Sequence, residues 1–178
     1  VRLMEQALAA RDIWLDIVAF EALHDRFLAY YEKNALVASG LFANVAQTLA
    51  ILSAAGHALA VCTNKPEAVA NDMLNGLGIG REFAAIVGGK TGRPKKPLPD
   101  PLLLAVKMAG GVPQNAIMIG DSEADICAAQ AAGMRSIAVS FGYTAIPPQS
   151  LGADWMIDCF SELPEAVDMI GPKRIGIA

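Results

Sequence analysis

Residues 116–133 read AIMIGDSEADICAAQAAG, and this stretch decides the fold. Its first four residues form a short apolar run, which is typical of a buried β-strand. The run ends in Gly120-Asp121, and the alanine-rich stretch that follows stops at Gly133, a residue type that commonly ends helices. A buried strand that leads directly into a helix is the repeating unit of an α/β protein.

The same alternation of strand and helix recurs along most of the chain. Further short apolar runs predict strands at 58–62, 84–87, 136–139 and 155–157. Helical patterns lie between or after these runs, at 43–55, 66–78 and 161–170. Short buried strands that alternate with helices imply right-handed crossovers and a parallel sheet. We therefore expect an α/β fold, a Rossmann-like core whose parallel sheet has helices on both faces.

Two regions depart from this alternation. Residues 1 to about 35 carry only helical patterning, with apolar residues at three- and four-residue steps from Ile17 to Tyr31. Residues 90–100 are rich in Gly, Pro and Lys, which predicts a long irregular loop. We expect a small, partial helical domain at 1–38 and the α/β core at 39–178.

The composition argues against several classes of function. The chain has 178 residues, a net charge of −4 and no long run of Lys or Arg, so we expect no nucleic-acid partner. Its three cysteines are widely spaced and form no Cys-x-x-Cys motif, which favours buried thiols in the cytoplasm over a zinc site or disulfides. Residues 34–64 lack charged side chains, but Asn44, Gln47 and Thr48 interrupt them, so we predict no membrane span.

Polar residues stand where the predicted strands end, the edge at which parallel sheets bind their ligands. The set comprises Thr63, Asn64, Lys96, Asp121 and Asp125, with Lys96 in the predicted loop. A phosphate monoester requires hydrogen-bond donors, a fixed cation and a divalent metal ion held by carboxylates, and this set offers each of them. Taken singly, Thr63 or Asp121 could equally cap a helix, and Lys96 could be a solvated loop lysine.

Three segments also match a known family, in order along the chain. They are 61–66 (VCTNKP), 96–103 (KPLPDPLL) and 119–125 (IGDSEAD). These segments resemble motifs two, three and four of the haloacid dehalogenase superfamily of hydrolases. The similarity covers about residues 1–170 and is greatest to the phosphoglycolate phosphatase group, which 131–134 (AAGM) and 141–143 (FGY) also resemble. The resemblance implies a Mg²⁺-dependent phosphatase acting on a small phosphorylated metabolite, with 2-phosphoglycolate as the leading candidate.

The resemblance also implies a role for each site residue. Thr63 would bind the transferring phosphoryl group through its hydroxyl, assisted by the backbone or side chain of Asn64. Lys96 would neutralise phosphoryl charge and keep the attacking carboxylate ionised. Asp121 would coordinate Mg²⁺, while Asp125 would act on the metal site through a metal-bound water or through the lysine. The helical domain at 1–38 would be part of a cap that excludes water and helps to choose the substrate.

One expected element is missing from the chain. The family's first motif is an Asp-x-Asp at the end of a strand, whose first Asp attacks phosphorus and whose second serves as general acid and base. No Asp-x-Asp occurs among the 178 residues, and the early Asp12, Asp16 and Asp25 lie within helical patterning. We therefore expect a core without its first strand, which lies mid-sheet in this family, and a chain that begins within the cap and is inactive alone.

Other interpretations stay open at this point. The same fold could serve a pyrophosphatase, a sugar-phosphate phosphatase or a phosphomutase, and the chain could also be an inactive fragment or a non-catalytic binding module. Lys90 stands where the phosphoglycolate phosphatase group usually carries an Asp, which alters the loop without removing a catalytic group. We expect a monomer or a homodimer.

Overall fold

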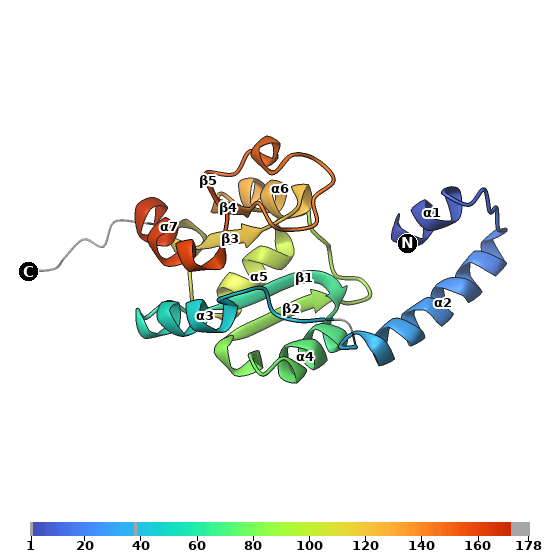
Figure 1. The fold of residues 1–178 in the computed structure, drawn as a ribbon, viewed down its shortest axis with the longest axis horizontal. Helices are drawn as coiled ribbons and strands as arrows, with labels where there is room; N and C mark the ends of the chain where they lie inside the picture. Colours follow the sequence, from blue (N-terminus) through green and yellow to red (C-terminus); the bar gives the residue numbers. More distant parts are fainter. Residues whose placement is uncertain (1, 38, 172–178) are drawn as a thin grey trace, which may run out of the picture. The chain divides into compact units, whose positions relative to one another are not determined.

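The computed structural model describes residues 2–37 and 39–171, and Figure 1 shows them as a ribbon. The chain divides into two compact units between Gly40 and Leu41. The predicted domain boundary falls at residue 38, which lies outside the described residues.

The first unit consists of two helices, α1 (Arg2–Ala9) and α2 (Ile17–Asn34). Helix α2 begins after Asp16, whose Oδ1 accepts a hydrogen bond from Ala19 N at 2.8 Å, so this aspartate is an N-cap. The stretch before and into α2 leaves large apolar side chains in solvent, with Trp14 89% and Ile17 78% exposed. The unit contains no strand among the described residues.

The second unit alternates strands and helices, as the sequence predicts. Its strands are β1 (Ala60–Pro66), β2 (Ala85–Gly89), β3 (Ile117–Gly120), β4 (Arg135–Val139) and β5 (Trp155–Ile157). Its helices are α3 (Val45–Ala54), α4 (Glu67–Gly76), α5 (Asp100–Met108), α6 (Glu123–Ala131) and α7 (Leu163–Ile170). Helix α5 was not predicted, and it starts where the Pro-rich loop ends, with Pro101 in its first turn. The unit is an α/β fold with parallel strands, which confirms the predicted class.

The described strands form two parallel sheets, an arrangement that fits the predicted parallel sheet without its mid-sheet strand. Strand β1 pairs only with β2, and β3, β4 and β5 pair in that order. Strands β1 and β3 are therefore each hydrogen-bonded to a neighbouring strand along one edge and not along the other. All four residues of β3 are only partly buried, whereas four of the five residues of β4 are buried.

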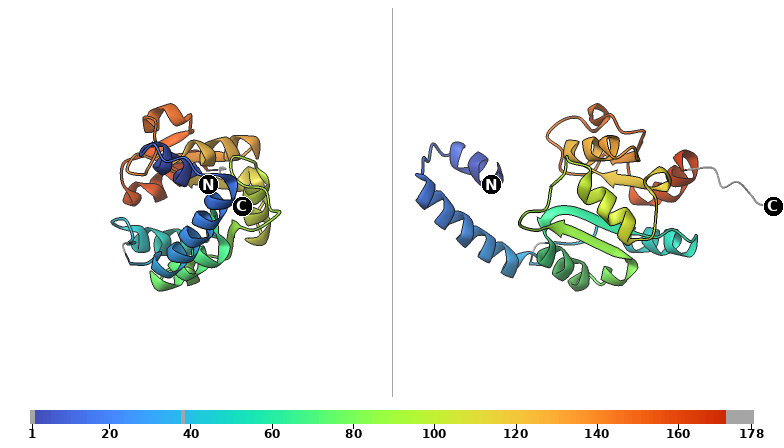
Figure 2. Two further views of the ribbon diagram at one scale, coloured as in Figure 1. Left: turned by 90° about the vertical axis from the view of Figure 1, so that its right-hand side faces the viewer. Right: turned by 180° about the vertical axis from the view of Figure 1, so that it is seen from behind.

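Helices cover both faces of the strands, as predicted. On one face, Leu52 of α3 and Leu163 of α7 pack against Ile137 and Ile157 of the three-stranded sheet. On the other face lie α5 and α6, which Figure 2 shows on the same side of the strands. Their residues Leu102, Ala128 and Ala129 form a cluster that also receives Cys62 of β1 and Met118 of β3. This cluster joins the two sheets without a hydrogen bond between them.

The uncharged stretch at 34–64 forms the end of α2, a connection, α3 and most of β1. Within the part of the chain that the structure describes, no helix is both long enough and apolar enough to cross a membrane.

Candidate active site

A pocket of about 230 Å³ opens at the carboxyl ends of β1 and β3. Its lining residues are Thr63, Asn64, Lys65, Lys96, Asp121, Ser122, Ala124 and Asp125. All five residues named from the sequence line this pocket, although they come from β1, a loop, the turn after β3 and the first turn of α6. A hollow of about 550 Å³ on the first unit is larger, but no lysine or arginine lines it, so it offers a phosphate no fixed cation.

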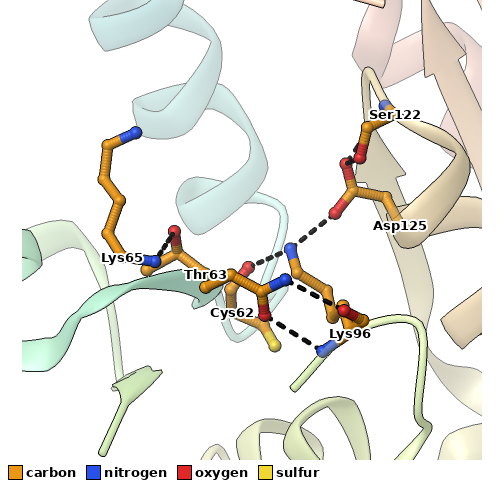
Figure 3. Close-up of polar contacts among 7 residues, drawn as sticks. Cys62, Thr63, Lys65, Lys96, Ser122 and Asp125 are labelled. Carbon is orange, nitrogen blue, oxygen red and sulfur yellow. Dashed lines mark hydrogen bonds and ion pairs between the residues drawn. The ribbon is translucent and has the colours of Figure 1, made fainter. Parts of the chain in front are cut away.

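The centre of the pocket is an ion pair between Lys96 and Asp125. Lys96 Nζ lies 2.5 Å from Asp125 Oδ1, and the side chains are only 9% and 8% exposed. The same ammonium donates a hydrogen bond of 2.6 Å to the carbonyl oxygen of Cys62, the third residue of β1 (Figure 3). The lysine therefore joins the first sheet to the start of α6, and its charge is fixed in place where water is largely excluded.

Asp125 is held by its own helix as well as by the lysine. Its Oδ2 accepts hydrogen bonds from Ser122 Oγ at 2.6 Å and from Ser122 N at 3.2 Å, which forms a capping box at the start of α6. Gly120 makes room for this carboxylate, since a Cβ at that position would lie 2.4 Å from Asp125 Cβ. Both carboxylate oxygens of Asp125 are thus engaged by protein donors, an arrangement that suits action on a metal ion through the lysine or through water.

Thr63 and Asn64 lie in the carboxyl-terminal half of β1, and their side chains make different contacts. Asn64 Nδ2 donates to the carbonyl of Lys96 at 2.9 Å, and Lys96 N donates to Asn64 Oδ1 at 3.0 Å. The asparagine side chain therefore fixes the backbone of the loop at Lys96. Thr63 Oγ1 accepts a hydrogen bond from Lys65 N at 3.2 Å, and its hydroxyl proton stays available for a ligand in the pocket.

Asp121 is anchored by a loop after β4. Its Oδ2 accepts a hydrogen bond of 2.8 Å from Tyr143 N. Gly142 permits this approach, because a Cβ there would lie 2.1 Å from Asp121 Cβ. The sequence signalled residues 141–143 only as part of the family resemblance, and their contact with Asp121 was not predicted.

The pocket offers oxygen ligands of the kind that Mg²⁺ binds, but too few to hold the ion without water or substrate. This ion prefers oxygen ligands and is usually held by one or two carboxylates, several waters and substrate phosphate. Asp121 is partly exposed, and no described residue donates to its Oδ1, so this oxygen is suited to a metal ion. Among residues 2–37 and 39–171, no group of three or more His, Cys, Asp or Glu residues could hold a metal by itself.

A second charged cluster lies beside the pocket and was not predicted. Glu67 pairs with Lys90 and with Arg93, both at 2.5 Å. Hydrogen bonds from Lys90 and then from Arg93 lower the pKa of Glu67 to about 2. The partners are distant in sequence, so no local pattern reveals them. Nearby, burial raises the pKa of the Cys62 thiol, which argues against Cys62 as a nucleophile.

Residues 8–139 match the family model of the haloacid dehalogenase-like hydrolases. The chain belongs to this family. It is 40% identical over 165 residues to a phosphoglycolate phosphatase of Agrobacterium fabrum, covering 93% of this chain and 71% of that protein. It is 38% identical over 148 residues to a phosphoglycolate phosphatase of Rhodospirillum rubrum, covering 83% and 61%.

Solved structures agree with this assignment. The crystal structure of a predicted phosphoglycolate phosphatase from Haemophilus somnus 129pt superposes with a TM-score of 0.83 at 32% identity, covering 92% of this chain and 73% of that one. The haloacid dehalogenase-like chain thus spans between about three fifths and three quarters of the length of these relatives.

Proposed function

We propose that this protein is a Mg²⁺-dependent phosphatase of small phosphate monoesters, with 2-phosphoglycolate as the leading candidate substrate. The observation that carries the proposal is the pocket in which a buried lysine, a free threonine hydroxyl and a partly exposed aspartate converge. Its relatives from Agrobacterium fabrum and Rhodospirillum rubrum, named as phosphoglycolate phosphatases, support the choice of substrate.

Each pocket residue has a task in this proposal. Thr63 donates its hydroxyl proton to a phosphoryl oxygen, and Lys96 neutralises the charge that the transferring group carries. Asp125 and Asn64 hold Lys96 through its ammonium and its backbone respectively. Asp121 would hold Mg²⁺, which supplies further neutralisation of phosphate charge when bound. The pocket volume of about 230 Å³ suits a phosphate with a small organic group.

The reaction also requires an attacking carboxylate that the 178 residues do not supply as an Asp-x-Asp motif. We propose that it comes from a strand that pairs between β1 and β3, each of which has no strand partner on one edge among residues 2–37 and 39–171. The partial burial of all four β3 residues supports this placement, because a strand inside a parallel sheet is normally buried on both faces. A carboxylate at the end of such a strand would lie near Lys96, which donates a hydrogen bond to the Cys62 carbonyl of the neighbouring β1.

The proposed chemistry proceeds in two displacements. The carboxylate oxygen bonds to phosphorus while the bond to the alcohol oxygen breaks, and the alcohol leaves with a proton from a general acid. In the second displacement, the group that gave its proton to the alcohol takes one from water, and the water oxygen bonds to phosphorus while the bond to the carboxylate oxygen breaks. This step releases inorganic phosphate and restores the carboxylate. We further propose that the protein works in the cytoplasm as a monomer or homodimer, with no nucleic-acid partner.

The proposal is tested by measuring intact mass and phosphate release on the same preparation. Substrates would be 2-phosphoglycolate, a sugar phosphate and pyrophosphate, each with Mg²⁺ and with excess chelator. Substitutions of Asp121 are measured in the same assay. Asp168→Asn, which changes an exposed carboxylate on α7, is their matched control. We expect Mg²⁺-dependent release, fastest from 2-phosphoglycolate, by a protein with a mass above 18.6 kDa.

Two outcomes would count against parts of the proposal. A protein of greater mass that binds phosphate but releases none from any ester would indicate a binding module. Robust turnover by a polypeptide of 18.6 kDa would contradict the need for a further strand.

A further inference from the structure

We propose that Glu67 is a positioning residue that anchors the loop presenting Lys96 to the pocket. The inference deepens the proposed function, and it rests on that function only where Lys96 is taken as the phosphate-binding cation. Glu67 itself does not line the pocket.

One carboxylate joins three parts of the second unit. Glu67 is the first residue of α4, and its Oε1 lies 2.5 Å from Lys90 Nζ while its Oε2 lies 2.5 Å from Arg93 Nη1. Oε2 also accepts a hydrogen bond of 3.2 Å from Gly88 N, near the end of β2. Arg93 Nη1 donates in turn to Gly88 O at 2.8 Å, which closes a ring of contacts. We name Glu67, Gly88, Lys90 and Arg93 the Glu67 clamp.

The clamp depends on a close approach of two backbones. A Cβ at position 88 would lie 2.3 Å from Glu67 Cα, so only glycine lets the start of α4 come this near to β2. This approach places the Glu67 carboxylate directly over the point where the chain leaves β2 and enters the loop.

The far end of the same loop is held by a residue three positions before Glu67. Asn64 makes two hydrogen bonds to the backbone of Lys96, at 2.9 and 3.0 Å. The junction between β1 and α4 therefore grips residues 90–96 at both ends. Fixing both ends of a short loop removes most of its alternative conformations, so loss of one anchor should loosen the other.

The two cations of the Glu67 clamp require a negatively charged side chain at position 67. Lys90 is 56% exposed and Arg93 23%, whereas the Glu67 side chain is 18% exposed. Two cations within reach of one partly buried carboxylate would repel each other if that charge were removed. Because the pKa of Glu67 is about 2, the clamp keeps its charge throughout the neutral range.

The test compares Glu67→Gln with two other variants of the full chain. Lys90→Met removes the more exposed partner, and Glu162→Gln is the matched control, since Glu162 also accepts a backbone hydrogen bond beside a helix start but lies at α7. The primary measurement is amide hydrogen exchange at Lys96, whose N–H is held by Asn64 Oδ1. The second is the affinity for inorganic phosphate, and thermal unfolding is followed in parallel.

We expect Glu67→Gln to speed exchange at Lys96 about tenfold, the size expected for loss of one charged hydrogen-bond anchor, and to weaken phosphate binding several-fold. Lys90→Met should produce a smaller change in the same direction, and Glu162→Gln none at Lys96. Exchange at Lys96 that is unchanged in Glu67→Gln, with only a lowered melting temperature, would overturn the proposal and leave a purely stabilising ion pair. Faster exchange in a protein that never binds phosphate would uphold the clamp and refute the proposed function instead.

Discussion

The second unit contains two ion-paired clusters that look alike and differ in burial. In both, a carboxylate from the first turn of a helix lies 2.5 Å from a cation in the loop at 90–96. The Lys96–Asp125 pair is less than 10% exposed, whereas Lys90 in the Glu67 clamp is 56% exposed. A buried pair becomes costly to break because each charge has lost its water, while an exposed pair is screened. The inner pair should therefore dominate stability and chemistry, and the outer clamp should adjust the loop.

The largest effect is expected from breaking the inner pair on one side only. Asp125→Ala leaves a buried ammonium whose remaining partner is the carbonyl of Cys62. The free energy of unfolding, measured by urea denaturation, should fall by about 3–5 kcal/mol. Removing both charges in Lys96→Met/Asp125→Ala should recover much of this loss. A single variant that loses less than about 1 kcal/mol would show that the pair is not buried in solution.

The next largest effect concerns catalysis rather than stability. Lys96→Met removes the fixed cation, and phosphate release by the active protein should fall about 10²–10³-fold, as for loss of one group that stabilises developing charge. Stability should suffer less than in Asp125→Ala, because Asp125 keeps its hydrogen bonds from Ser122. Lys107→Met, at an exposed position on α5, serves as control for removing a lysine. A steady-state assay with equal loss in both variants would remove Lys96 from the mechanism.

The contrast between the clusters also separates what the sequence could and could not predict. Asp121 directly follows a predicted strand and Asp125 comes four residues later, so their place at the ligand-binding edge followed from the geometry of parallel strands. Lys96 lies in a loop, and its place in the site followed only from the family resemblance. The clamp was missed because Arg93 lies 26 residues from Glu67, and such a pairing leaves no periodic signal.

The fold shows the same division between local and long-range information. Apolar runs bounded by glycine predicted the strand β5 at 155–157 and placed β2, β3 and β4 to within two residues at either end. A missing mid-sheet strand was predicted from the family resemblance. That its neighbours are β1 and β3 was not predicted, because strand pairing depends on contacts far apart in the chain. The role of Asn64 was likewise predicted only in part. Its position after a predicted strand was clear from the sequence, but its hydrogen bonds to the Lys96 backbone were not.

A moderate loss of stability and of phosphate affinity is expected when the loop at 90–96 loses its anchor at Asn64. Asn64→Ala removes both hydrogen bonds to the Lys96 backbone, and the free energy of unfolding should fall by about 1–2 kcal/mol. Affinity for phosphate should weaken more than this loss of stability alone explains, because Lys96 loses its anchor. Gln130→Ala removes a comparable amide bond to Gly152 O, away from the pocket, and should leave phosphate affinity unchanged. Equal affinities in the two variants would mean that the contacts of the Lys96 ammonium with Asp125 and Cys62 O position it without help from Asn64.

The smallest effect is the pH dependence of the outer clamp. The pKa of Glu67 is lowered to about 2, first by Lys90 and then by Arg93, from about 4.3 in an unfolded chain. A lowered folded-state pKa contributes stability that is fully present above the unfolded value and is lost as pH falls through the folded value. After screening, the contribution should not exceed about 1 kcal/mol. The difference in unfolding free energy between the parent chain and Glu67→Gln should therefore be constant from about pH 5 to 7 and shrink below about pH 4.5. A difference that grows on acidification would mean that the carboxylate is not held by these two cations, and the clamp would lose its electrostatic basis while the inner pair kept its own.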